Sequence, residues 1–174
     1  MLDRWLPDSS VRTFHRRAAS ARRDALWEAA TTIRLGDTRR LGRLVRWRIP
    51  GLHPSQTYHE VFRAYPFTVL EEADGVLLSG LCGRIWTPAR DYPRLESPEE
   101  FAAWREGGTV RVAFAHWVRE GEDGRAELCS EARVQPVDVA ARLRLRAVWA
   151  LVGPFERLVG AEPLELAVRR AERA

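Results

Sequence analysis

The amino-acid sequence predicts an α+β domain, with a curved antiparallel sheet of six to seven strands wrapped around one long C-terminal helix. Between residues 57 and 135, segments of strand length follow one another with turn residues between them, so sequential strands can pair. Between residues 138 and 159, apolar side chains recur every three or four positions, which is the period of one helix face. Because 174 residues match the usual size of one domain, we expect residues 1–174 to fold as a single unit.

The first third of the chain predicts a strand followed by two short helices. Residues 11–17 alternate bulky and polar side chains, as the two faces of a strand do. Ser20 can cap a helix over residues 21–33, because its hydroxyl can accept a bond from a backbone N–H of the first turn. A second helix is expected over residues 38–47, ending before Pro50 because the residue before a proline disfavours helical backbone angles.

Five later segments are predicted to be strands. They cover residues 57–63, 67–72, 76–86, 110–120 and 126–135. Ala73-Asp74-Gly75 lies between the second and third of these segments and is typical of a tight hairpin turn. In the two longest strands, one set of alternate side chains is apolar and the other is charged or amphipathic. We therefore expect a sheet with a single buried face.

A long helix is predicted from Asp138, a good N-cap residue, to about Val159. Its apolar positions are expected to face the sheet; they are Ala140, Leu143, Ala147, Leu151, Phe155 and Leu158. At about 1.5 Å per residue the helix is roughly 32 Å long, and a strand over residues 110–120 is roughly 37 Å long at about 3.4 Å per residue. The helix is therefore long enough to cover the buried face. A final short helix is expected over residues 163–172.

The connection over residues 87–108 separates two of the predicted strands. Residues 87–95 contain two prolines, and Ser97 then begins a short helix with a capping box and a proline at its first position. Loops on a rigid scaffold often carry access or recognition. We therefore expect this connection to be mobile and to lie at one end of the space between sheet and helix.

The order of these elements resembles the helix-grip fold of the START-like (SRPBCC) superfamily, which includes polyketide cyclases, lipid-transfer START domains, ubiquinone-binding proteins and birch-pollen-type allergens. Short motifs resemble uncharacterised bacterial members: EARV at 131–134 with DVAAR at 138–142 and Trp149, FTVLEE at 67–72, and GRIW at 83–86. The resemblance covers nearly the whole chain. It implies a cavity between the sheet and the C-terminal helix, lined by apolar side chains with a few polar ones.

Several strand residues that should face the helix are small, which allows such a cavity. They are Gly80, Gly83, Ala126, Ser130 and Ala132. Small residues opposite a helix give either close packing or a hole, and the resemblance favours the hole. The residues predicted to bind a ligand are Val112, Phe114 and His116 on one strand face, Ser130, Leu151 of the helix, and Arg84 with Trp86 at the mouth. The competing interpretation of the last two is a solvated arginine beside a packed indole.

His116 is the candidate for acid–base chemistry in the cavity, because imidazole titrates near neutral pH. A histidine satisfied within the packed core is the competing interpretation. Motifs for a nucleophile, a metal site or a phosphate-binding loop are missing from the sequence, so we expect no metal and no cofactor. Glu131 and Arg133 stand two apart in one strand and are expected to take part in a cross-strand ion pair on the outer face of the sheet.

The basic residues are 28 arginines without a lysine, spread from Arg4 to Arg173. A codon bias toward GC-rich triplets explains the missing lysine more simply than a polyanion does, so we expect no nucleic-acid partner. Apolar runs fall short of the roughly 20 residues of a membrane span, and the first residues lack an apolar signal core, so a cytoplasmic protein is expected. Cys82 and Cys129 lie in apolar strand-like runs and are expected to be buried free thiols.

Three functions follow from these observations. A carrier or sensor of a hydrophobic small molecule (a lipid, polyketide or aromatic compound) needs only the cavity, and this is the first prediction. A polyketide cyclase-like enzyme needs an acid–base partner for His116 that the sequence does not show. An interaction protein would use an arginine-rich surface. The sequence leaves both catalysis and the oligomeric state open.

Overall fold

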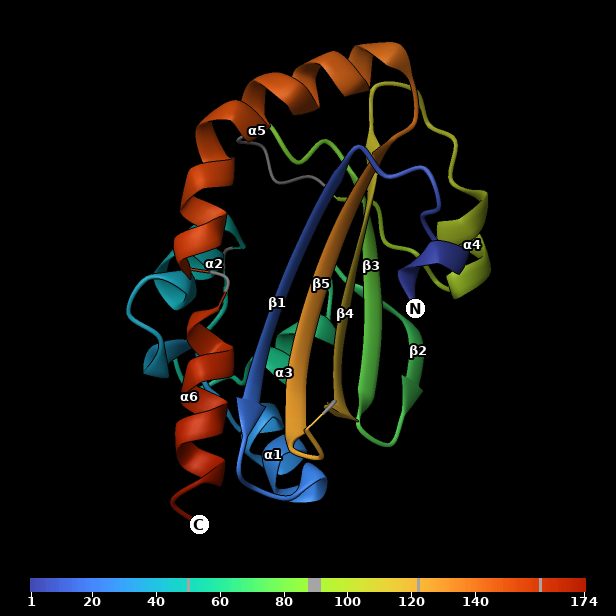
Figure 1. The fold of residues 1–174 in the computed structure, drawn as a ribbon. Coiled ribbons are helices and arrows are strands. Elements are labelled where there is room, and N and C mark those ends of the chain that lie inside the picture. The colour runs from blue at the N-terminus through green and yellow to red at the C-terminus, as the bar shows by residue number, and fades with distance from the viewer. Residues whose placement is uncertain (50, 88–91, 122, 160) are drawn as a thin grey trace.

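The computed structural model describes residues 1–49, 51–87, 92–121, 123–159 and 161–174 (Figure 1). Its strands are β1 (Val11–Ala19), β2 (Thr68–Ala73), β3 (Val76–Gly83), β4 (Val110–Glu120) and β5 (Ala126–Pro136). Its α-helices are α1 (Arg23–Thr31), α2 (Leu41–Arg48), α3 (Tyr58–Phe62), α4 (Pro98–Ala103), α5 (Val139–Val159) and α6 (Glu162–Ala171). Short 3₁₀ turns, η1 (Leu2–Arg4) and η2 (Leu35–Asp37), precede β1 and α2.

The strands of the described chain form one antiparallel sheet in the order β1-β5-β4-β3-β2. The α+β class with an antiparallel sheet is confirmed, but the sheet has five strands, not six to seven. The predicted strand over residues 57–63 is wrong, because Tyr58–Phe62 form helix α3 there. The Thr57 hydroxyl accepts a bond from the Glu60 N–H (3.1 Å) and the Glu60 carboxylate accepts one from the Thr57 N–H (2.7 Å), so a capping box begins a helix here.

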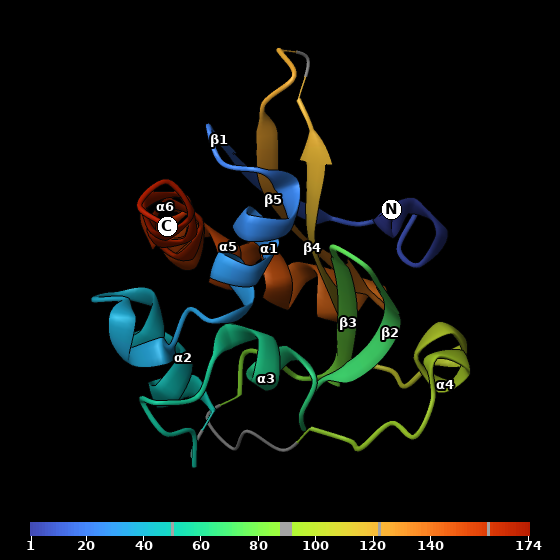
Figure 2. The same ribbon diagram turned by 90° about the horizontal axis from the view of Figure 1, so that it is seen from below.

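Helices cover both faces of the sheet (Figure 2). The inner face, which carries Thr13, Phe114 and Ser130, packs against α1, α3 and α6, while η1 and α4 lie against the outer face. The outer-face core consists of Leu2, Leu6, Leu70, Leu78, Cys82, Leu95, Phe101, Ala113 and Ala115. The expectation of a single buried face is therefore wrong. The N-terminal segment helps to bury the outer face: its two leucines, Leu2 and Leu6, are fully buried although they belong to no periodic pattern.

Helix α4 belongs to this outer-face core. A Cβ on Gly80 would lie 2.6 Å from the Phe101 ring, so Gly80 is small because α4 packs directly on the sheet there. The predicted connection over 87–108 therefore does not bring its helix over the inner face. Residues 88–91 of that connection lie outside the described residues.

Glu131 and Arg133 lie on the outer face, as predicted, but they are only 4% and 3% exposed. The Arg133 guanidinium donates to Glu131 Oε1 (2.7 Å) and to Asp3 Oδ1 (2.9 Å), and it also donates to the Leu6 carbonyl. Arg12, on the neighbouring strand, lies 2.8 Å from the same Glu131 oxygen. The ion pair thus anchors the N-terminal segment and is buried by it.

Helix α5 does not lie along the sheet as expected; it crosses one end of it, and α6 then runs beside the edge strand β1 (Figure 1). Asp138 accepts bonds from the N–H groups of Ala141 (2.7 Å) and Gly108 (2.6 Å), which hold the start of α5 at this end. Ala141 and Leu145 are consequently the buried positions, whereas Leu143 is 60% exposed and Leu151 is 77% exposed. At the positions whose side chains the structure describes, the predicted sheet-facing stripe is therefore wrong, because α5 is apolar on more than one side; the side chains of Phe155 and Leu158 lie outside the described part.

Cys82 and Cys129 are buried free cysteines, as predicted. Across the described ranges, no helix combines the length and the apolar character needed to cross a membrane.

Candidate functional site

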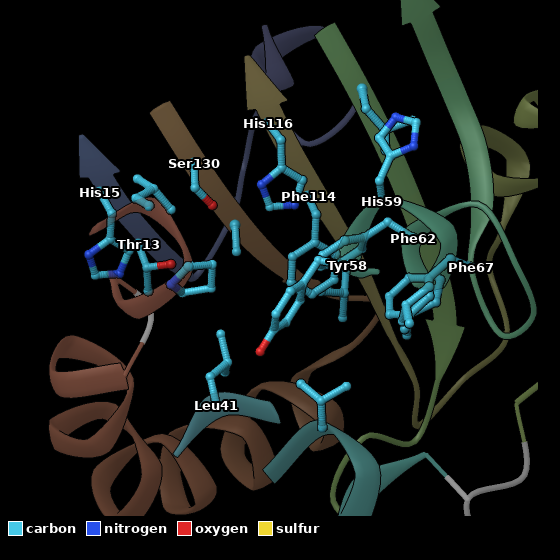
Figure 3. Close-up of a pocket in the computed structure, with 18 of the residues that line it drawn as sticks. Thr13, His15, Leu41, Tyr58, His59, Phe62, Phe67, Phe114, His116 and Ser130 are labelled. Atoms are coloured by element: carbon cyan, nitrogen blue, oxygen red, sulfur yellow. The ribbon is translucent and has the colours of Figure 1, made fainter. Parts of the chain in front are cut away.

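A cavity of about 430 Å³ lies between the inner face of the sheet and the helices (Figure 3). Strands β1, β5, β4 and β3 form one wall, and α1, α2 and α3 form the opposite one. Trp149 of α5, Leu164 of α6 and residues of the connections, such as Phe67, Ile85 and Tyr92, also line the cavity. Strand lining residues such as Leu77, Val112 and Val134 are buried, whereas Leu44 of α2 is 43% exposed, so the α2 side is more open to solvent.

The lining is almost entirely apolar. It includes Val11, Leu41, Val45, Ile49, Val61, Leu77, Leu81, Ile85, Leu128, Ala132 and Val134. Phe62, Phe67 and Phe114 form an aromatic group, with ring centroids 5.0 to 5.7 Å apart. Aromatic pairs at these distances attract one another beyond the burial of their surfaces. The three rings therefore stabilise one another in this part of the cavity wall.

Polar groups in the cavity gather in one row across the sheet. His15 of β1 and His116 of β4 are both register partners of Ser130 on β5, which lies between them. Figure 3 shows these side chains among the labelled lining residues, with Thr13 of the adjacent row nearby. The row crosses three neighbouring strands, so a ligand that lies across the sheet can meet three polar side chains at this level.

His116 has a buried Nε2 atom with no hydrogen-bond partner among the described residues. Its ring packs on Phe62, with centroids 4.6 Å apart. Burial, together with the nearby His59, lowers the pKa of His116 from 6.5 to about 4. The imidazole is therefore neutral at pH 7, and a ligand hydroxyl or carbonyl can supply the missing hydrogen bond.

Tyr58 presents its ring to the cavity and anchors its hydroxyl in the wall. The Thr38 hydroxyl donates to the Leu35 carbonyl (3.0 Å), so its oxygen accepts the bond from the Tyr58 hydroxyl (2.6 Å). Burial raises the pKa of Tyr58 well above its usual value. Tyr58 therefore fixes α3 against the turn before α2 and stays uncharged.

Four of the predicted ligand-binding residues come together in the cavity: Val112, Phe114, His116 and Ser130. Their role in binding stays a prediction. The other three do not line the cavity. Leu151 faces solvent. Because β3 ends at Gly83, Arg84 has a half-exposed side chain 4.0 Å from Glu106, and Trp86 packs against the core cluster that contains Val110.

Sequence reasoning missed the cavity residues that the helices supply, above all Tyr58 and Phe62 of α3. The capping box Thr57-Tyr58-His59-Glu60 was the available signal. It predicts a helix, in which residues four apart share one face. His15 was also missed, although its alternation with Thr13 in β1 placed both on one face.

Comparison with known proteins gives little guidance. No family model matches the chain, and no curated protein matches it. Among solved structures, a hypothetical protein of Helicobacter pylori is 11% identical, with a TM-score of 0.41, over 97% of this chain and 93% of the other. The di-domain ARO/CYC StfQ from the steffimycin biosynthetic pathway is 11% identical, with a TM-score of 0.34, over 99% of this chain and 54% of that one. Ara h 8.0201 is 8% identical, with a TM-score of 0.31, over 94% and 99%.

Proposed function

We propose that this protein binds a hydrophobic small molecule, such as a lipid, a polyketide or an aromatic compound, between its sheet and its helices. The observation that carries the proposal is the cavity of about 430 Å³ with its almost wholly apolar wall. Sites for small molecules commonly measure about 300–1,000 Å³ and combine an apolar lining with a few placed polar groups. The row of His15, Ser130 and His116 supplies those polar groups.

We further propose that the chain is a divergent member of the helix-grip superfamily that its sequence resembles. The element order supports this: one strand, short helices, a run of antiparallel strands and a long C-terminal helix. Two features depart from the expected pattern. The sheet has five strands, and α5 crosses one end of the sheet, so α2 and α3 supply cavity wall that the C-terminal helix was expected to provide.

Binding fits the site better than cyclase chemistry does. A general acid–base works best with a pKa near the working pH, and His116 is neutral at pH 7 because its pKa is lowered to about 4. No carboxylate is found among the described residues that line the cavity, so His116 lacks an acidic partner there. We therefore assign the row of polar residues to ligand orientation.

A dye titration with a blocking variant tests the proposal. Ala132 lies on the inner face of β5 and lines the cavity, so Ala132→Trp places an indole inside it. Ala18→Trp is the matched control, since Ala18 is exposed on β1 outside the cavity. The neutral fluorophore N-phenyl-1-naphthylamine should bind the native protein and the Ala18 variant alike and should lose at least tenfold affinity for the Ala132 variant. Equal affinity in all three would refute the proposal, provided circular dichroism shows that each is folded.

A further inference from the structure

A second, open cleft adjoins the cavity at the end of the sheet that α5 crosses. Its lining consists of Ser10, Val11, Arg142, Leu145, Arg146, Trp149 and Ala150. Val11 and Trp149 line both the cleft and the cavity, so the two spaces meet at these side chains. A molecule in the apolar cavity therefore lies next to the cleft.

The cleft differs from the cavity in carrying two positive charges. Arg142 and Arg146 are one helical turn apart on α5, so both guanidinium groups leave the helix on the same side. In the part of the chain that the structure describes, no carboxylate forms an ion pair with either of them, although eleven other arginines have such partners. Two unpaired guanidinium groups beside an apolar cavity form a site for an anionic group.

The distribution of charged residues along α5 also favours an anionic ligand in the cleft. Residues 139–155, which make up most of α5, contain three arginines and no acidic residue, although the whole chain has 24 Asp and Glu. The third arginine, Arg144, points elsewhere: its guanidinium lies toward Gly108, 3.6 Å from where a Cβ on that glycine would be. The positive side of α5 that borders the cleft is therefore formed by Arg142 and Arg146.

We propose that the ligand is an amphiphile whose anionic group lies on Arg142 and Arg146 and whose apolar chain lies in the cavity. This inference rests on the proposed function and adds the chemical class of the ligand. From Val11 at the cleft to His15 in the polar row, β1 advances four residues, which is roughly 14 Å at about 3.4 Å per residue. A carboxylate or phosphate with a medium-length acyl chain matches that distance.

A pair of competitors that share one chain isolates the contribution of the anion. Laurate and dodecanol carry the same alkyl chain, but only laurate is charged at pH 7.5. Each is titrated against N-phenyl-1-naphthylamine bound to the native protein. Laurate should displace the dye at about tenfold lower concentration than dodecanol, since two partly exposed ion pairs contribute modestly. Raising the salt concentration should reduce the preference, because exposed charges are screened.

The double variant Arg142→Gln with Arg146→Gln should bring the two competitors to within about twofold of each other and leave dodecanol unchanged. Arg144→Gln is the matched control on the same helix and should keep the native preference. Equal displacement by laurate and dodecanol in the native protein, or a preference that survives in the double variant, would overturn the inference while leaving the proposed function intact. Failure of the dye to bind any form would overturn the proposed function itself.

Discussion

Two phenylalanines on opposite faces of one sheet offer a direct comparison between packed core and cavity wall. Phe101 of α4 is fully buried on the outer face, where its ring lies 6.1 Å from that of Trp5. Phe114 of β4 lies on the inner face, packs on Phe62 and Phe67, and presents the rest of its ring to the cavity. Replacing each with alanine makes the same chemical change in the two environments.

The expected losses of stability differ. Phe101→Ala removes a ring from a filled core and leaves a new hole, which typically costs about 3–5 kcal/mol. For Phe114→Ala, the space beside the ring already exists, so only the contact surface is lost. A Phe side chain buries roughly 150–250 Å², and about half of that at about 25 cal/mol per Å² gives about 2–3 kcal/mol. From the middle of the two ranges, we expect the Phe114 variant to lose about 1.5 kcal/mol less than the Phe101 variant.

Urea unfolding followed by tryptophan fluorescence measures both losses, and dye titration separates them further. Phe114→Ala should weaken binding of N-phenyl-1-naphthylamine several-fold, whereas Phe101→Ala, measured where it is folded, should leave it unchanged. The reasoning is refuted if Phe114→Ala costs as much stability as Phe101→Ala and leaves dye affinity unaltered. In that case Phe114 would be an ordinary core residue.

Three further predictions concern His116 in the cavity wall, the cap of α3 and the buried ion pair on the outer face. The pKa of His116 is about 4 in the folded protein and about 6.5 in the unfolded chain, so the unfolded chain binds more protons between these values. The free energy of unfolding should therefore fall as the pH drops through that window. His116→Asn should reduce this loss between pH 7.5 and 4.5 by about 2 kcal/mol, and parallel pH profiles for the two proteins would contradict the prediction. Thr57→Ala removes the cap of α3 and should lower the free energy of unfolding, measured with urea, by about 1 kcal/mol. An unchanged free energy of unfolding would mean that α3 does not depend on its cap. Arg133→Met leaves the buried Glu131 with Arg12 as its remaining ion-pair partner and should cost roughly 3 kcal/mol of stability. Arg125→Met, which breaks an exposed ion pair, should cost under about 0.5 kcal/mol. Similar losses of stability in the two variants would refute the role of Arg133 as the partner of a buried carboxylate.

Much of the strand pattern could be predicted because alternation is a local signal. The two long strands have the predicted faces, and Val112, Phe114, His116 and Ser130 meet in the cavity because β4 and β5 pair in register with their inward residues aligned. The hairpin at Ala73-Asp74-Gly75 was also predictable, since Gly75 adopts the positive φ of 71° that such a turn requires.

Helix α3, the buried face of α5 and the burial of the outer face depend on contacts that the local periodicity of the sequence does not show. Residues 57–63 fit both a strand and a capped helix, and the Thr57–Glu60 capping box decided for the helix. The face that α5 buries was set by the bonds of Asp138 to Gly108 and Ala141, because its sequence offers more than one apolar side. Leu2 and Leu6 gave no periodic signal, so burial of the outer face could not be foreseen.

Native mass spectrometry of the protein purified from its own host tests the central claim most directly, because it needs no choice of ligand. The native protein should carry a bound small molecule that is released on unfolding. Ala132→Trp, purified in the same way, should have the bare mass of the chain, and Ala18→Trp should carry the same adduct as the native protein. Bare mass for all three forms, or an identical adduct on the blocked variant, would contradict a ligand held in this cavity.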